Sequence, residues 1–443
     1  MHEWQGMSAA ELGRGIGAGR IDPLALTEMF LDAADSHPFG QRIYARMTRE
    51  RALAEAHAAR ARARDGVRRG PLDGVPLSWK DLFDTAGTVT EAGSALLAGR
   101  VPKTDAEVLA RASRAGLVCL GKTHMTELAF AGLGYNPITA TPPNRYDADL
   151  LPGGSSSGAA TSVAYGLAAG GIGSDTGGSV RVPSAWNGLV GLKTTAGLLP
   201  LDGVVKLCPS FDTVGPLVRT VEDAALVHAV LAEAPVPDLS ECSLRGTRLL
   251  VLDTVARDDV DPAVADGFQA AVEKLADAGA EVTEAEVPSV ADAMGTSGTL
   301  FATEAYATCG ALIEDAPEKM FANVLDRFRG GRDVMAVDYL RAWDRLRAAK
   351  ANYLEATAGY DAVLVPTAPI LPPTIAEVAA DAAVYTAKNL MALRNTRIGN
   401  LFDLCVLTLP TGARHVGLSL LAPPFTEARL LRLGMAAEAA LTD

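Results

Sequence analysis

Several kinds of residue and segment are scarce in this chain, and each scarcity narrows the class of protein. The 443 residues include six histidines and five cysteines, and no two cysteines form a Cys-x-x-Cys pair. The odd number and wide spacing of the cysteines predict buried thiols rather than a disulfide framework or a thiolate zinc site. No run of apolar residues approaches the ~20 that a membrane helix needs, so we expect no contact with a membrane.

Aromatic residues are also few, at 5%, while apolar residues make up 49% and charged residues 21% of the chain. This balance is typical of a globular protein and argues against disorder. The net charge of −13 repels polyanions, so we expect no nucleic-acid partner. Residues 1–6 lack the basic and apolar regions of a secretory signal, which predicts a cytoplasmic protein.

From about Leu72 onward, short apolar runs alternate with helical stretches. The expected strands are Val75–Leu77, Leu117–Leu120, Leu249–Leu252, Ala362–Val365 and Cys405–Leu409. The expected helices between them include Ala106–Ala115 and Val221–Ala232. Such alternation predicts an α/β fold in which helices cover both faces of a β-sheet.

The two ends of this pattern suggest how the chain is organised. Residues 1–70 are predicted to form helices packed on the outside, because Asp22-Pro23 is a typical helix start and Arg49–Arg64 has high helix propensity. The segment of about 240–360 is expected to form a peripheral helical lobe. With no repeat and no low-complexity linker, we expect residues 1–443 to form a single α/β domain.

The chemistry is concentrated in a glycine-rich block between Gly153 and Gly197 and in Lys80, which follows an apolar run. Serine is a weak nucleophile until a neighbouring base takes its proton, and a buried lysine can be that base because desolvation favours its neutral form. Lys80 is therefore the candidate base and Ser179 the candidate nucleophile. Ser155 is the candidate proton relay between them. The glycines before Ser179 would let consecutive backbone amides point at one oxygen, as in an oxyanion hole.

These motifs resemble those of the amidase signature family, whose members use a Ser-Ser-Lys triad. The resemblance runs from about Gly70 to Thr195 and includes Lys80-Asp81, Gly153–Gly158 and Asp175–Arg181. It implies a large mixed β-sheet core, and it assigns Lys80, Ser155 and Ser179 to the triad. It also implies the features that follow: a cis peptide bond at Gly154-Ser155, an oxyanion hole formed by Thr176, Gly177, Gly178 and Ser179, and an acyl pocket lined by Ala129 and Phe130.

Other interpretations of the same residues are weaker. Gly153 and Gly158 have the spacing of a phosphate-binding loop, but Ala159-Ala160 stand where Lys and Ser or Thr are needed. Ser179 does not lie in the Gly-x-Ser-x-Gly motif of histidine-dependent hydrolases. We expect His124 to be a structural or pocket-wall residue rather than a base, and Lys122 and Lys193 to be structural. We expect Asp175 and Arg181 to pair and stiffen the nucleophile loop rather than to contact the substrate directly.

The sequence therefore predicts an amidase that hydrolyses a small-molecule carboxamide, or a related C–N bond, with no metal or cofactor. One alternative is the glutamine-hydrolysing subunit of a tRNA-dependent amidotransferase, which works in a complex. Another is a non-catalytic binding protein on the same scaffold. The oligomeric state stays open, with a homodimer as one option.

Overall fold

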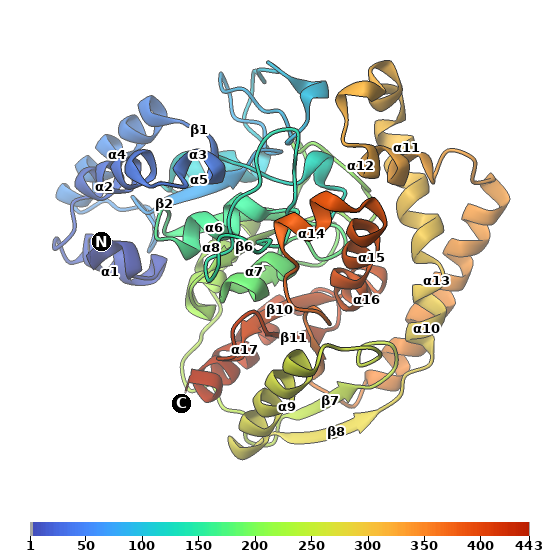
Figure 1. Ribbon diagram of the computed structural model, residues 1–443. Helices are drawn as coiled ribbons and strands as arrows, with labels where there is room; N and C mark the ends of the chain where they lie inside the picture. The colour runs from blue at the N-terminus through green and yellow to red at the C-terminus, as the bar shows by residue number, and fades with distance from the viewer. Residues whose placement is uncertain (1–2, 443) are drawn as a thin grey trace.

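One mixed sheet of eleven strands runs through the computed structural model, which describes residues 3–442 (Figure 1). Its order is β1-β3-β2-β4-β6-β5-β10-β11-β9-β7-β8. The strands are β1 (Tyr44–Met47), β2 (Pro76–Lys80), β3 (Val118–Thr123), β4 (Gly170–Asp175), β5 (Val190–Lys193), β6 (Thr213–Val218), β7 (Arg248–Leu252), β8 (Glu281–Ala285), β9 (Ala362–Pro366), β10 (Cys405–Pro410) and β11 (Gly417–Ala422). Strands β3, β2 and β4 are parallel to one another, as are β9, β7 and β8, and the pairs between these two groups are antiparallel.

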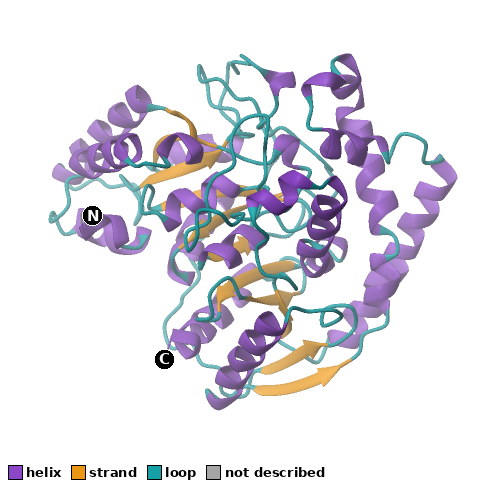
Figure 2. Cartoon of the chain, viewed as in Figure 1, coloured by secondary structure: helices purple, strands orange, loops and turns teal. Residues whose placement is uncertain are grey.

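Helices surround the sheet on both sides (Figure 2). They are α1 (Ala9–Gly17), α2 (Pro23–Ser36), α3 (Gly40–Ile43), α4 (Arg49–Arg64), α5 (Glu107–Arg114), α6 (Ser157–Ala164), α7 (Arg181–Asn187), α8 (Val221–Ala232), α9 (Pro262–Asp277), α10 (Ser289–Met294), α11 (Ser297–Asp315), α12 (Ala322–Arg329), α13 (Ala336–Thr357), α14 (Ile375–Ala380), α15 (Ala382–Ala392), α16 (Arg394–Leu401) and α17 (Glu427–Thr442). Short 3₁₀ turns lie at Glu3–Gly6, Ala95–Leu97, Glu127–Ala129 and Pro317–Lys319. Among residues 3–442, no helix combines the length and the apolar character required to cross a bilayer.

The two ends of the sheet carry different groups of helices. In Figure 1, α2 and α4 gather near β1 at one edge of the sheet, while α10, α11, α12 and α13 stand together on the other side of the molecule. Helix α2 begins as its sequence indicates, since the Asp22 carboxylate accepts the Leu24 amide at 2.8 Å and Pro23 occupies the first turn.

The α/β class and the mixed sheet agree with the sequence prediction, and the five apolar runs all lie in or overlap strands. The all-helical expectation for residues 1–70 was wrong at β1, where Tyr44–Met47 pairs antiparallel with β3. The segment of about 240–360 likewise is not purely helical, because it supplies β7 and β8 to the edge of the sheet. The single-domain organisation stays a prediction.

Glycines in β4 allow α6 to lie directly on the sheet. A Cβ atom at Gly171 would lie 2.7 Å from the Ala159 carbonyl oxygen, and one at Gly173 would lie 2.5 Å from the Ser156 hydroxyl. Both distances are too short for real contacts, so only glycine permits this close approach. The consequence is that the residues just before α6 and the residues at the end of β4 come together.

Candidate active site

Lys80 is the last residue of β2 and lies entirely in the interior of the protein. Its Nζ atom donates to the Ser155 Oγ at 2.7 Å and to the Ser174 Oγ at 2.7 Å. Both partners are hydroxyl groups, and no carboxylate among residues 3–442 forms an ion pair with this lysine. A lysine held only by hydroxyls can lose its proton without breaking an ion pair, which suits a base.

Burial lowers the pKa of Lys80 to about 7, and the more distant carboxylates of Asp175 and Asp212 act in the opposite direction. Desolvation dominates because removing an ammonium from water without a counter-ion is costly. The neutral amine is therefore populated near neutral pH, as the sequence-based hypothesis for Lys80 requires.

Ser155 follows a cis peptide bond at Gly154-Ser155, the linkage that the resemblance implied. It lies shortly before α6, which begins at Ser157. The next residue, Ser156, donates its amide to the Ser179 carbonyl oxygen at 3.2 Å and its hydroxyl to the Ser174 carbonyl oxygen at 3.2 Å. These bonds fasten the relay segment to β4 and to the loop that carries Ser179.

Ser179 lies in the loop between β4 and α7, and a buried ion pair stiffens that loop. The Arg181 Nη2 atom lies 2.8 Å from the Asp175 Oδ1, and the Nε donates to Oδ2 at 3.0 Å. The Asn400 amide also donates to Asp175, at 2.9 Å. Despite burial, the Arg181 guanidinium holds the pKa of Asp175 well below its usual range, so the expected Asp175-Arg181 pair is confirmed.

The backbone amides of this loop are not equivalent. The Gly178 amide donates to the Asp175 Oδ1 at 2.9 Å. The amides of Thr176, Gly177 and Ser179 have no hydrogen-bond acceptor within residues 3–442. Three of the four expected oxyanion donors are therefore unpaired, while Gly178 helps to orient the Asp175 carboxylate.

A pocket of about 320 Å³ opens beside the nucleophile. Its walls include Ser179, Thr176 and Gly177 together with Ala129 and Phe130 from the turn after β3. Ala129 has a left-handed backbone, with φ of 60°. Lys80 and Ser155 are absent from the wall and fully buried, so among the triad candidates only Ser179 meets the pocket.

Comparison with known proteins identifies the family. The family model described as Amidase matches residues 25–431. The chain belongs to the amidase signature family. It is 38% identical to a 2-amino-5-chloromuconic acid deaminase from Comamonas testosteroni, over 84% of this chain and 82% of that protein. It is 32% identical to a glutamyl-tRNA(Gln) amidotransferase subunit from Acidothermus cellulolyticus, over 98% of this chain and 94% of that protein. A crystal structure of an amidase matches with a TM-score of 0.88 and 30% identity, over 98% of this chain and 99% of that one.

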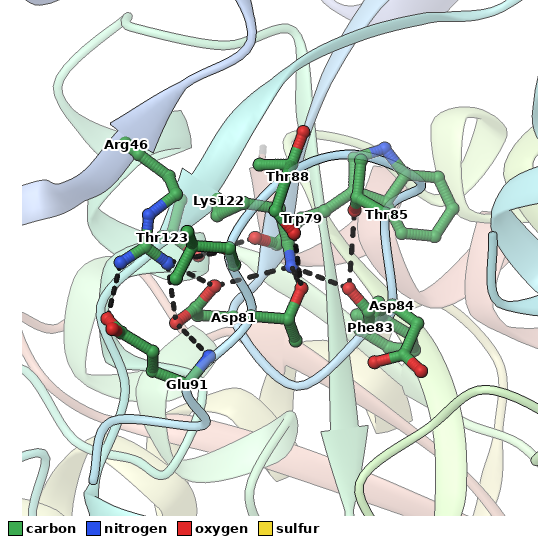
Figure 3. Close-up of polar contacts among 12 residues, drawn as sticks. Arg46, Trp79, Asp81, Phe83, Asp84, Thr85, Thr88, Glu91, Lys122 and Thr123 are labelled. Carbon is green, nitrogen blue, oxygen red and sulfur yellow. Dashed lines mark hydrogen bonds and ion pairs between the residues drawn. The ribbon is translucent and has the colours of Figure 1, made fainter. Parts of the chain in front are cut away.

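A second buried lysine of this amidase-family chain shows by contrast what sets Lys80 apart. Lys122 on β3 lies 3.3 Å from the Asp81 carboxylate and donates to the Phe83 carbonyl oxygen at 2.5 Å (Figure 3). Figure 3 also shows Arg46 bridging Asp81 and Glu91. This charged network fixes the chain immediately after Lys80, and it agrees with the structural role expected for Lys122.

The other residues that we expected to be structural also lie outside the pocket wall. Lys193 donates to the carbonyl oxygens of Thr194, at 2.9 Å, and Leu404, at 2.7 Å. His124 uses its backbone, since its amide donates to the Ile43 carbonyl oxygen and its carbonyl accepts the Gly158 amide. Burial lowers the pKa of the His124 imidazole to about 4.

Sequence reasoning missed several groups at this site. Ser174 contacts the Lys80 amine as closely as Ser155 does. The Thr176 hydroxyl donates to the buried Asp212 carboxylate at 2.5 Å. Burial raises the pKa of Asp212. Arg327 and Arg397 line the pocket from distant parts of the chain. Ser174 and Thr176 both adjoin Asp175 in the signature, and this position is a signal that could have been used, whereas the two arginines carry none.

Proposed function

We propose that this chain hydrolyses a small-molecule carboxamide through an acyl-enzyme formed on Ser179, with Ser155 as proton relay and Lys80 as base. The observation that carries the proposal is the 2.7 Å contact between the fully buried Lys80 Nζ and the Ser155 Oγ. Family membership supports the amide C–N bond as the target.

In the proposed first step, the Ser179 oxygen attacks the amide carbonyl and its proton passes to Ser155, while the Ser155 proton passes to the neutral Lys80 amine. The carbonyl oxygen becomes an oxyanion, for which the unpaired amides of Thr176, Gly177 and Ser179 are the proposed donors. Because the Gly178 amide already donates to Asp175, we leave it out of this set.

In the proposed second step, the proton stored on Lys80 returns through Ser155 to the leaving nitrogen. The C–N bond then breaks, ammonia or an amine departs, and the acyl group stays on Ser179. Water next gives up a proton to the same relay and attacks the ester. This releases the carboxylic acid and restores the Ser179 hydroxyl.

Two measurements on the purified chain test this mechanism. Mass spectrometry of the intact protein during turnover of a carboxamide should show an acyl adduct that maps to Ser179, and added hydroxylamine should divert the acyl group to a hydroxamate. A neutral fluorophosphonate should label Ser179, and Ser179→Ala should remain unlabelled. A Ser179→Ala variant that turned over amides at the wild-type rate would refute the proposal.

The second candidate function is glutamine hydrolysis within a tRNA-dependent amidotransferase complex. The 32% identity to a subunit of such an enzyme, over 98% of this chain, favours it. Glutaminase activity that requires an added partner protein would support this candidate. Turnover of simple amides by the isolated chain would support the first one instead.

A further inference from the structure

Two arginines share the pocket with Ser179. Arg327 comes from α12 and Arg397 from α16, and both line the cavity of about 320 Å³ that includes the nucleophile. Neither residue belongs to the signature region, and neither is used by the proposed acyl-transfer steps. The pocket therefore contains positive charge that the reaction at the amide carbonyl does not explain.

Arg327 is held in a fixed position in the pocket wall. Its Nη1 atom donates to the Phe130 carbonyl oxygen at 3.0 Å, and its guanidinium carbon lies 4.3 Å from the centroid of the Phe130 ring. Stacking on an aromatic face stabilises the cation. Since a guanidinium has five N–H donors and this contact uses one, most of its hydrogen-bonding capacity remains.

Arg397 lies directly against the nucleophile loop. The preceding residue, Thr396, donates its hydroxyl to the Gly177 carbonyl oxygen at 2.7 Å. A Cβ atom at Gly177 would have the Arg397 Cγ as its neighbour at 3.8 Å. The Nη2 atom of Arg397 is buried and has no hydrogen-bond partner within the part of the chain that the structure describes. Such an orphaned donor requires an explanation.

No acidic residue neutralises these two cations. Neither arginine forms an ion pair with any carboxylate between residues 3 and 442, although Arg181 in the same region is paired with Asp175. Burial lowers the pKa of Arg327, and burial together with the charge of Arg327 lowers the pKa of Arg397 to about 9. Because a guanidinium keeps its proton in proteins, two charged groups lie in this wall at an energetic cost that a bound anion would offset.

We propose that the pocket selects amides that carry a second, anionic group, a carboxylate, and that Arg327 and Arg397 bind this group while Ser179 attacks the amide carbonyl. A carboxylate suits two guanidinium groups because they can bind it through parallel, charge-assisted hydrogen bonds. Because Ser179 and both arginines line the same small pocket, the carboxylate and the amide of the ligand must be joined by a short chain. This inference rests on the proposed function of Ser179.

The first test compares matched substrates on the wild-type protein. Succinamate and glutaramate, the monoamides of two short diacids, are compared with butyramide and pentanamide, which have the same chain length without the charge. We expect kcat/KM to be about 10- to 100-fold higher for the charged member of each pair, as the loss of a charge-assisted hydrogen bond implies. Equal values within each pair would overturn the proposal.

Variants assign the preference to the two arginines. Arg327→Met and Arg397→Met keep much of the length of the side chain and remove its charge, so each should lower kcat/KM for the charged amides by about 10- to 100-fold more than for the neutral ones. The control is Arg329→Met, because Arg329 lies on the same helix as Arg327 but pairs with Glu314 at 2.7 Å, outside the pocket. A charge preference that survived in both pocket variants would contradict the assignment.

A third measurement does not depend on turnover. Succinate and glutarate should slow the labelling of Ser179 by a neutral fluorophosphonate in the wild type, and should protect less in Arg397→Met. Labelling without any protection would overturn the anion proposal and leave the proposed role of Ser179 intact. If Ser179 were not labelled at all, the proposed function itself would fail, and this inference with it.

Discussion

The Ser174 hydroxyl lies 2.7 Å from the Lys80 Nζ, as close as the Ser155 hydroxyl lies to the same nitrogen. The two serines nevertheless lie in different parts of the fold. Ser155 precedes α6 and is next in sequence to Ser156, whose amide reaches the Ser179 carbonyl, whereas Ser174 is part of β4. Only Ser155 is therefore proposed to carry protons, and Ser174 is proposed to position the Lys80 amine.

This difference can be measured with two matched substitutions. We expect Ser155→Ala to lower kcat by about 10²- to 10⁴-fold, the usual contribution of a proton-transfer group. Ser174→Ala should lower kcat by about tenfold, because it removes one of the two hydrogen bonds of Lys80 and not the relay. Steady-state kinetics on a single amide checks both. Equal losses for the two variants would argue against separate roles.

The pH dependence of the reaction should report Lys80. Its pKa is lowered to about 7, so kcat/KM should rise with pH through about 7 and level off above it, as the neutral base becomes populated. Ser174→Ala should shift the midpoint of this rise, since the hydroxyl contacts the titrating nitrogen. A profile that is flat between pH 5 and 9 would contradict Lys80 as the base.

The same lysine should reduce the stability of the fold. The pKa of Lys80 is lower in the folded state than in the unfolded state. The unfolded chain therefore binds more protons than the folded chain between about pH 7 and pH 10. As a result, the contribution of Lys80 to the free energy of unfolding rises with pH across that range. Lys80→Met should therefore be more stable than the wild type at pH 7, with the difference shrinking toward pH 10. Urea denaturation at several pH values measures it, and a wild-type advantage at pH 7 would refute the argument.

The buried Asp175-Arg181 pair should matter more for stability than a surface pair. Arg181→Met leaves the Asp175 carboxylate buried with only neutral donors, which should cost about 3–5 kcal/mol of unfolding free energy. Arg64→Met is the control, because Arg64 and Asp65 form an exposed pair that should contribute little. Losses of similar size in the two variants would contradict this prediction.

The triad candidates could be predicted because their signal is local. Lys80 follows an apolar run, and Ser155 and Ser179 each lie in a short glycine-rich motif. Arg327 and Arg397 carry no such motif. They reach the pocket only because α12 and α16, which follow the signature at a long distance in the sequence, fold back against it.

Strand β1 was missed for a related reason. It has four residues and lies directly between α3 and α4, so neither its length nor its pattern separates it from the helices around it. Its pairing with β3, where Arg46 lies opposite Lys122, is a tertiary contact that no local propensity encodes. The hydrogen bond of the Gly178 amide could not be predicted from the sequence either, because it needs the Asp175 carboxylate in the position where Arg181 holds it.

The two glycines before the nucleophile should respond differently to the same substitution. Gly178 has φ of +136°, and a Cβ atom there would lie 2.2 Å from the Thr396 Oγ1. Gly177 has no positive φ, and its closest neighbour for a Cβ atom is at an ordinary 3.8 Å. Gly178→Ala should therefore lower the unfolding free energy by roughly 2–5 kcal/mol, through backbone strain and overpacking, while Gly177→Ala should change it by less than about 1 kcal/mol.

Urea denaturation of the two alanine variants beside the wild type tests this pair, since both add one methyl group within the same loop. Labelling of Ser179 gives a second measurement, because the Gly177 amide is among the proposed oxyanion donors and remains present in Gly177→Ala. That variant should keep its fold and still be labelled at Ser179 by a fluorophosphonate. If Gly178→Ala were as stable as Gly177→Ala, then α16 would not be packed against the nucleophile loop as described, and the placement of Arg397 beside Ser179 would lose its support.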